Sequence, residues 1–190
     1  MERQTGHLSR DIREVVNNIT WMKVIAIGNA NVGKTCLIKH FCESKFSQCY
    51  HATVGVDYGF KVQNVNGIPY RVHLWDLSGD EQYYDVRTEL YNGTDACFLV
   101  YDVTNPSSFE SLDNWLKEIA KHGAMGAKVV VVGNKADLRS NRGSIATTEG
   151  RKWATSRKLP YYETSALTGD GVSTMFTELL DSISEKKPRH

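Results

Sequence analysis

The chain has 190 residues, of which 41% are apolar and 24% are charged, and its net charge is +1. This composition excludes a disordered chain, a collagen-like chain and a disulfide scaffold, and the length suits one domain with a full core. The balanced charge argues against a protein that holds nucleic acid through phosphate contacts, so no nucleic-acid partner is expected.

The sequence also carries no sign of export or of membrane insertion. No apolar run reaches the roughly 18 residues that predict a membrane-spanning helix, and the N-terminus lacks the apolar centre of a signal peptide. The four cysteines include no Cys-x-x-Cys pair. These features favour a reducing, cytoplasmic compartment.

Residues 1–20 differ from the rest of the chain. Five apolar side chains recur there at helical spacing, namely Leu8, Ile12, Val15, Val16 and Ile19. The pattern predicts an amphipathic extension, and packing on the domain is preferred over a membrane role because the polar face carries both charges. Binding of a partner is the third possibility. The main domain is expected over residues 21–185, followed by a short basic tail at residues 186–190.

The main domain alternates between strand and helix patterns. In chain order, strands are predicted at residues 22–28, 54–65, 70–76, 96–103, 128–133 and 161–164. Helices are predicted at residues 34–43, 105–122 and 147–157, and from residue 172 to the end of the domain. Asn66-Gly67 predicts a hairpin between the second and third strands. The order indicates an α/β fold with a mostly parallel sheet and one antiparallel edge strand.

A phosphate-binding loop is predicted where the first strand meets the first helix. Residues 28–35 read Gly-Asn-Ala-Asn-Val-Gly-Lys-Thr, which fits G-x-x-x-x-G-K-[ST]. Backbone N–H groups at the helix N-terminus would surround a phosphate, and the helix dipole favours negative charge there. Lys34 would reach the β- and γ-phosphates, and the Thr35 hydroxyl would ligate Mg²⁺. Alone, this motif admits kinases, ATPases and GTPases.

Two further loops indicate that the base of the bound nucleotide is guanine. Asn134-Lys135-Ala136-Asp137 follows the strand that ends at residue 133. The Asp137 carboxylate can accept two N–H bonds from guanine, whereas adenine would leave this charge unpaired. The Lys135 stem can lie over the base, and Asn134 can tie its loop to the phosphate loop. Backbone N–H groups at residues 163–167, Glu-Thr-Ser-Ala-Leu, would suit the guanine oxygen.

With these motifs in this order, the chain resembles a Ras-superfamily small GTPase over residues 21–185. The resemblance implies a six-stranded sheet with about five helices, a switch between GDP and GTP forms, bound Mg²⁺ and a monomer. Phe46 corresponds to the aromatic side chain that stacks on guanine. The resemblance places nucleotide contacts at Asn31, Val32, Gly33, Lys34, Thr35, Cys36, Phe46, Thr53, Gly79, Asn134, Lys135, Asp137, Ser165, Ala166 and Leu167.

Two further segments resemble the switches of the Rab branch. Residues 51–58, His-Ala-Thr-Val-Gly-Val-Asp-Tyr, resemble switch I, with Thr53 as the sensor of Mg²⁺ and γ-phosphate. Residues 75–81, Trp-Asp-Leu-Ser-Gly-Asp-Glu, resemble the start of switch II. Asp76 would hold Mg²⁺ through water, beside Thr35 and Thr53, and the Gly79 N–H would contact the γ-phosphate.

Switch II departs from the family pattern at two positions. Asp80 stands where the family has the glutamine that orients the attacking water, and Ser78 replaces an alanine. A carboxylate about 4 Å from a phosphate charge costs about 4 kcal/mol at an effective dielectric of 20. Hydrolysis by Lys34, Thr53, Gly79 and Asp80 is therefore expected to be slow. The competing hypothesis is that Asp80 accepts a proton from water and works as a weak substitute.

The resemblance to Rab proteins is incomplete at the effector surface and at the C-terminus. Tyr58 and Trp75 match two members of the Rab aromatic triad, but Leu90 occupies the third position. No cysteine follows Cys97, so no lipid anchor is expected, whether the chain is truncated or prenyl-free. The replaced glutamine at position 80, the missing prenylation cysteine and the stretch at residues 84–91 together resemble the Rab-like subgroup that is sometimes fused to a DnaJ-type J domain.

The expected partners follow from the family. Effector proteins would bind the switches, an exchange factor would load GTP, and an activating protein could supply an arginine. A second hypothesis is a GTP-bound interaction scaffold that hardly hydrolyses. A third, a P-loop kinase acting on a small acceptor, is disfavoured by the guanine-reading motif at residues 134–137.

Overall fold

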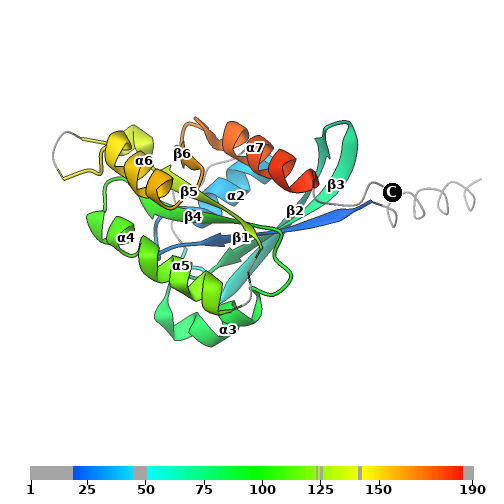
Figure 1. The fold of residues 1–190 in the computed structure, drawn as a ribbon, viewed down its shortest axis with the longest axis horizontal. Coiled ribbons are helices and arrows are strands. Elements are labelled where there is room, and N and C mark those ends of the chain that lie inside the picture. Colours follow the sequence, from blue (N-terminus) through cyan, green and yellow to red (C-terminus); the bar gives the residue numbers. More distant parts are fainter. Residues whose placement is uncertain (1–18, 45–50, 123, 125, 141–142, 186–190) are drawn as a thin grey trace, which may run out of the picture.

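The computed structural model describes residues 19–44, 51–122, 124, 126–140 and 143–185. The predicted N-terminal helix, Phe46 and the basic tail lie outside these residues. Six strands form one sheet in the order β2-β3-β1-β4-β5-β6 (Figure 1). They are β1 (Trp21–Ile27), β2 (Val56–Val65), β3 (Ile68–Leu77), β4 (Ala96–Asp102), β5 (Lys128–Asn134) and β6 (Tyr161–Glu163). Only β2 with β3 is an antiparallel pair, which confirms the predicted fold class.

Helices cover both faces of this sheet (Figure 1). On one face α2 (Lys34–Glu43) and α7 (Val172–Ser184) pack over the apolar side chains of the central strands. On the other face α5 (Leu112–Lys121) and α6 (Thr147–Ser156) pack over the alternate side chains of the same strands. Every residue of β4 is buried, as expected for a strand between two helical layers.

Local sequence signals account for most element boundaries. The predicted helix at residues 34–43 coincides with α2. At the predicted hairpin, Asn66 and Gly67 have φ angles of 52° and 83°. Positive φ at both central residues is what a two-residue hairpin turn with the native strand twist requires. The turn fixes the antiparallel register in which Val65 pairs with Ile68.

The helix predicted at residues 105–122 is wrong as a single element. It is divided at Ser111 into α4 (Pro106–Glu110) and α5. The Ser111 hydroxyl donates to the Ser107 carbonyl at 2.8 Å, and it accepts a hydrogen bond from Asn29 in the phosphate loop. Such bonding to the preceding turn competes with regular helix geometry. Pro106 opens α4 as predicted, but the Asn105 side chain makes no capping hydrogen bond.

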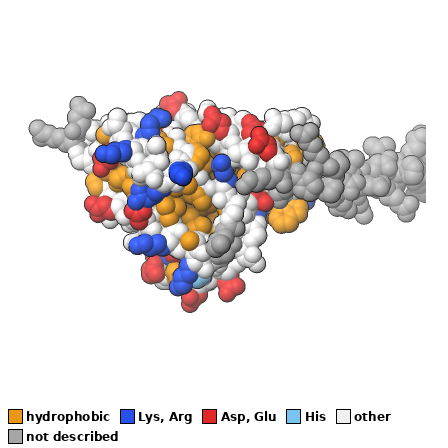
Figure 2. Space-filling model, in the orientation of Figure 1, with side chains coloured by type: hydrophobic (Ala, Val, Ile, Leu, Met, Phe, Trp, Pro, Cys, Tyr) orange, Lys and Arg blue, Asp and Glu red, His pale blue; other side chains and the backbone are white. Residues whose placement is uncertain are grey.

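Three short elements near the loops were not predicted: η1 (Glu81–Tyr83), α3 (Tyr84–Glu89) and η2 (Ala136–Leu138). No described helix is long and apolar enough to cross a membrane. On the face drawn in Figure 2, Lys and Arg side chains are interspersed with Asp and Glu, and hydrophobic side chains gather in the middle.

Candidate nucleotide-binding site

A cavity of about 360 Å³ lies at the edge of the sheet where the parallel strands end. Loops at this edge are the usual ligand site of an open α/β sheet, and the volume suits a small-molecule ligand. Residues from five separate segments line the cavity. They include Asn31, Gly33, Lys34, Thr35, Cys36, Thr53, Ser78, Gly79, Asp80, Gln82, Asn134, Lys135, Asp137, Ala166 and Leu167.

Most of the nucleotide contacts predicted from the sequence therefore share one cavity. Three other predicted residues lie just behind its wall. Val32, Asp76 and Ser165 are buried and contact the loops that line it. Phe46 is outside the described residues.

The phosphate loop wraps closely around the Lys34 side chain. Lys34 is buried, and its Nζ donates to the carbonyl oxygens of Gly28 and Asn29 at 2.9 Å each. Gly33 has φ 97°, and a Cβ there would lie 2.3 Å from the Asn134 amide nitrogen. Burial lowers the pKa of Lys34 to about 8, although the Asp76 charge opposes this shift. An anion in the cavity would stabilise the charged ammonium.

Three oxygen-bearing side chains converge beside this loop. Thr35 donates a hydrogen bond to Asp76 Oδ2, and Thr53 donates to the same oxygen at 3.1 Å. The two threonine hydroxyl oxygens are 3.2 Å apart. Asp76 Oδ1 is buried and has no hydrogen-bond partner among the described residues. Burial raises the pKa of Asp76, against hydrogen bonds from both threonines and the charge of Lys34.

This arrangement fits a hard divalent cation. Mg²⁺ takes oxygen ligands, and a cation would compensate the buried carboxylate whose second oxygen is unpaired. Thr35, Thr53 and Asp76 come from α2, the segment before β2 and β3, so the fold brings together residues far apart in the chain. These are the three metal ligands predicted from the sequence.

The segment predicted to form switch II begins where β3 ends next to the phosphate loop. A Cβ added to Gly79 would lie 2.4 Å from the backbone nitrogen of Ala30, so only glycine fits this approach. Ser78 is buried, and its Oγ accepts a bond from the Asp80 N–H at 3.3 Å. The Asp80 carboxylate is the N-cap of η1, since its Oδ1 accepts from the Gln82 N–H at 3.0 Å. Its Oδ2 accepts from Gln82 Nε2, also at 3.0 Å.

Asn134 joins three of the loops around the cavity. Its amide nitrogen donates to the Val32 carbonyl at 2.9 Å. Its amide oxygen accepts from Thr164 Oγ1 at 3.1 Å and from the Ala166 N–H at 3.3 Å. Lys135 follows in the left-handed region with φ 63°, and its Nζ lies 2.7 Å from Asp102. The next turn places Asp137 on the cavity wall.

An ion pair not predicted from the sequence stabilises the region that is predicted to contact the base. Arg139 donates to both carboxylate oxygens of Glu163, at 2.8 and 2.5 Å, and thereby links the segments that follow β5 and end β6. Thr147 and Tyr161 also donate to Glu163. Burial alone would raise the pKa of Glu163, but these hydrogen bonds together lower it. The sequence around Arg139 contains no local pattern that would predict its contact with Glu163.

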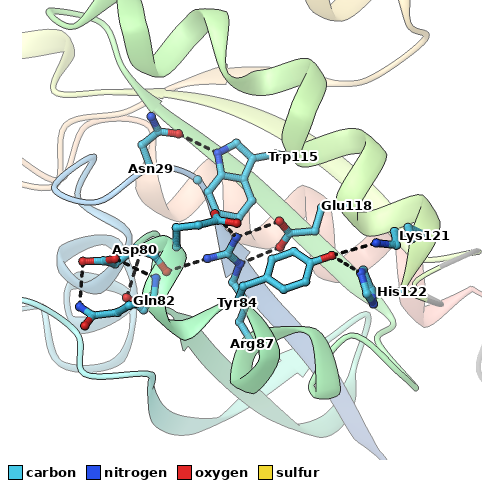
Figure 3. A network of polar contacts seen from close by, with 12 residues as sticks. Asn29, Asp80, Gln82, Tyr84, Arg87, Trp115, Glu118, Lys121 and His122 are labelled. Atoms are coloured by element: carbon cyan, nitrogen blue, oxygen red, sulfur yellow. Dashed lines mark hydrogen bonds and ion pairs between the residues drawn. The ribbon is translucent and has the colours of Figure 1, made fainter.

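A second missed cluster fixes switch II to α5 (Figure 3). Arg87 is only 1% exposed, and it donates to the two Glu118 carboxylate oxygens at 2.7 and 2.9 Å. Its Nη1 also donates to the Asp80 carbonyl at 2.8 Å, and its guanidinium lies 4.7 Å from the centre of the Trp115 ring. Trp115 in turn donates to Asn29 Oδ1 at 2.7 Å. Contacts thus run from the phosphate loop through α5 to switch II.

Two of the three predicted effector residues lie on β2 and β3, and the third, Leu90, ends α3. Tyr58 and Trp75 are cross-strand partners whose ring centres are 4.9 Å apart, and Tyr58 is exposed. The Tyr58 hydroxyl lies 2.5 Å from His73 Nδ1. Leu90 is partly buried against the core beneath α5.

Comparison with known proteins agrees with this geometry. The sequence profile of the Ras family matches residues 23–185. The chain is 44% identical over 167 residues to DnaJ homolog subfamily C member 27 of Gallus gallus, and 42% identical over 167 residues to that of Homo sapiens. It is 41% identical over 169 residues to the Danio rerio protein. The matches cover 85–86% of this chain but only 61–62% of these relatives.

Proposed function

The chain belongs to the Ras family of small GTPases, and from this premise we propose that it is a Rab-like GTP switch with slow intrinsic hydrolysis. The family supplies guanine-nucleotide binding and GTP hydrolysis as the class of activity. The likeness to DnaJ homolog subfamily C member 27 confirms the resemblance predicted from the sequence. The rate, the effectors and the ligand contacts belong to the proposal.

Each part of the nucleotide has a matching set of side chains in the proposal. Lys34 and the backbone N–H groups of the phosphate loop hold the β- and γ-phosphates. Thr35, Thr53 and Asp76 hold Mg²⁺, which when bound neutralises charge on the phosphate oxygens. Asp137 accepts the two N–H bonds of guanine. The unpaired, buried Asp76 oxygen supports this assignment of the cation site.

The observation that carries the slow rate is the engagement of Asp80. Its carboxylate caps η1 and binds the Gln82 amide, so both of its oxygens accept hydrogen bonds from protein. At neutral pH a carboxylate has no proton to donate to a phosphate oxygen. Charge repulsion of about 4 kcal/mol at about 4 Å would oppose its approach to the γ-phosphate. Asp80 therefore cannot reproduce both functions of a catalytic glutamine amide.

The proposal extends to partners. The exposed Tyr58 ring beside Trp75 supports an effector surface formed by β2, β3 and the switches. An exchange factor would control loading, and an activating protein with an arginine in trans could raise the rate by roughly 10³–10⁵. We place this activity in the cytoplasm, where GTP and Mg²⁺ are available.

Single-turnover hydrolysis of preloaded GTP with Mg²⁺ tests the proposal. Asp80→Gln should raise the rate by about tenfold or more, since it restores an amide that both accepts and donates. Asp85→Gln is the matched control, because it changes an exposed carboxylate of α3 and should leave the rate unchanged. A parent rate equal to that of Asp80→Gln would overturn the proposed slow step.

The nucleotide that co-purifies with the protein separates the switch from the scaffold hypothesis. A mixture of GDP and GTP would support a cycling switch. Nearly pure GTP, with no measurable turnover of the parent, would instead support a GTP-bound interaction scaffold, which the hydrogen-bonded state of Asp80 also favours.

A further inference from the structure

We propose that Gln82 orients the attacking water in this protein, and that Asp80 acts as the positioning residue that holds its amide. The inference rests on the proposed function and deepens it. Position 80 has lost the glutamine expected from the family, but another glutamine stands two residues later, on the wall of the same cavity as Lys34, Thr53 and Gly79.

The hydrogen bonds around Asp80 fix which end of the Gln82 amide faces the carboxylate. Gln82 Nε2 lies 3.0 Å from Asp80 Oδ2, and an ionised carboxylate can only accept a hydrogen bond. The nitrogen must therefore face Asp80, and Oε1 must point away from it. Within the described part of the chain this oxygen accepts no hydrogen bond, so it is available to a water molecule. Figure 3 shows the two side chains beside each other.

The backbone that carries this pair is held from the other side. The Asp80 carbonyl accepts a bond from Arg87 at 2.8 Å, and Arg87 is clamped to Glu118 on α5. Asp80 also accepts from the Gln82 N–H through its first carboxylate oxygen. Two hydrogen bonds between the same two residues, on an anchored backbone, reduce the conformational freedom of an otherwise exposed glutamine.

The pairing of Asp80 with Gln82 also bears on the repulsion between the Asp80 carboxylate and a γ-phosphate. Both carboxylate oxygens of Asp80 accept hydrogen bonds from Gln82, which stabilise its negative charge on the cavity wall. The neutral Gln82 side chain can then face the region where the γ-phosphate would lie. An amide there accepts from water without adding charge beside the phosphate.

The reaction remains ordinary hydrolysis. Gln82 Oε1 accepts a hydrogen bond from the water, whose oxygen forms the new bond to the γ-phosphorus. The bond from the γ-phosphorus to the β–γ bridging oxygen breaks, GDP leaves, and the water proton ends on the released phosphate. Lys34 stabilises the charge that develops on the oxygens.

Three variants of this pair, assayed by single-turnover hydrolysis of preloaded GTP, test the inference. Gln82→Ala and Gln82→Glu should each lower the rate by about tenfold, since the first removes the amide and the second cannot donate to Asp80. Asp80→Ala should also lower it, although removal of a harmful charge alone would raise it. Gln82→Ala added to Asp80→Gln should have no further effect, because position 80 then orients the water itself.

The affinity for GTP is the readout that a merely structural role would move. This affinity should stay within about twofold of the parent value in every variant. The control is Gln63→Ala, a half-buried glutamine of β2 away from the cavity, in which both the rate and the affinity should stay at the parent values. A parental rate in Gln82→Ala, or loss of GTP binding there, would refute the role of Gln82. A parent that binds no GTP would refute the proposed function itself.

Discussion

The buried ion pair between Arg87 and Glu118 gives the sharpest prediction about stability. Arg87 is 1% exposed and Glu118 12%, and two N–H···O bonds of 2.7 and 2.9 Å join them. Glu118 also accepts from the Tyr91 hydroxyl at 2.7 Å. Burial would lower the pKa of Arg87, but the hydrogen bonds and charge of Glu118 raise it, so the guanidinium stays charged. Glu81 also accepts from Arg87 at 3.2 Å, but it is 84% exposed, so the buried Glu118 carboxylate supplies most of the compensation for this charge.

Glu118→Gln removes that compensating charge but keeps one acceptor oxygen. Breaking a buried pair costs about 3–5 kcal/mol, and the remaining acceptor places this change near 3 kcal/mol. For a domain of this size about 1 kcal/mol shifts the Tm by about 2–4 °C, so a loss of about 6–12 °C is expected. Glu110→Gln, an exposed site on α4, should cost less than about 0.5 kcal/mol.

Thermal and urea unfolding at fixed GDP and Mg²⁺ would measure these values, because bound ligand adds to the apparent stability. The double variant Arg87→Met with Glu118→Leu should recover much of the loss, since no buried charge is left unpaired. A cost below about 1 kcal/mol for Glu118→Gln would mean that solvent screens the pair, and the reasoning would fail.

Three other substitutions test separate parts of the site. Glu163→Gln should cost about 2–3 kcal/mol at pH 7, between exposed and buried pairs. The pKa of Glu163 is lowered on folding, so its contribution exists above the ordinary glutamate pKa and is lost as pH falls through the folded value. The cost measured in urea should therefore shrink in acid. Gly79→Ala should weaken GTP binding by about tenfold or more in equilibrium titration, because the added Cβ meets the Ala30 backbone. Asp137→Asn should reduce GTP affinity by about a hundredfold and improve binding of xanthosine triphosphate, whose base presents an acceptor to the new amide.

The parts of the fold that could be predicted are those whose signals are local. The strand at residues 22–28 is apolar apart from Lys23, and its glycine loop and the helix behind it follow within 15 residues. β1 and α2 accordingly have nearly the predicted bounds. The hairpin turn is set by Asn66 and Gly67 alone. The division at Ser111 was missed because apolar residues keep helical spacing across it, and a contact with distant Asn29 helps to stabilise it.

The site residues that were not predicted depend on partners far away in the sequence. Arg87 is an arginine among acidic residues on a short helix, a pattern typical of a solvated surface. Its burial results from α5 packing over it, with Glu118 lying 31 residues away in the chain. Arg139 and Glu163 are 24 residues apart. Long-range partners of this kind leave no periodicity in the sequence, so only the folded arrangement reveals them.

The hydrogen bonds around Asp80 explain why a substitution at position 80 would affect several neighbouring side chains. Asp80 is held through its carbonyl by Arg87, through its N–H by Ser78 and through its carboxylate by Gln82. Arg87 packs on Trp115, which is hydrogen-bonded to the phosphate loop at Asn29. A shift of the Asp80 backbone must break the bond to Arg87 or carry that buried arginine with it. The Asp80 carboxylate is therefore hydrogen-bonded within its own turn, and the proposed role of the longer Gln82 side chain at the cavity depends on that contact.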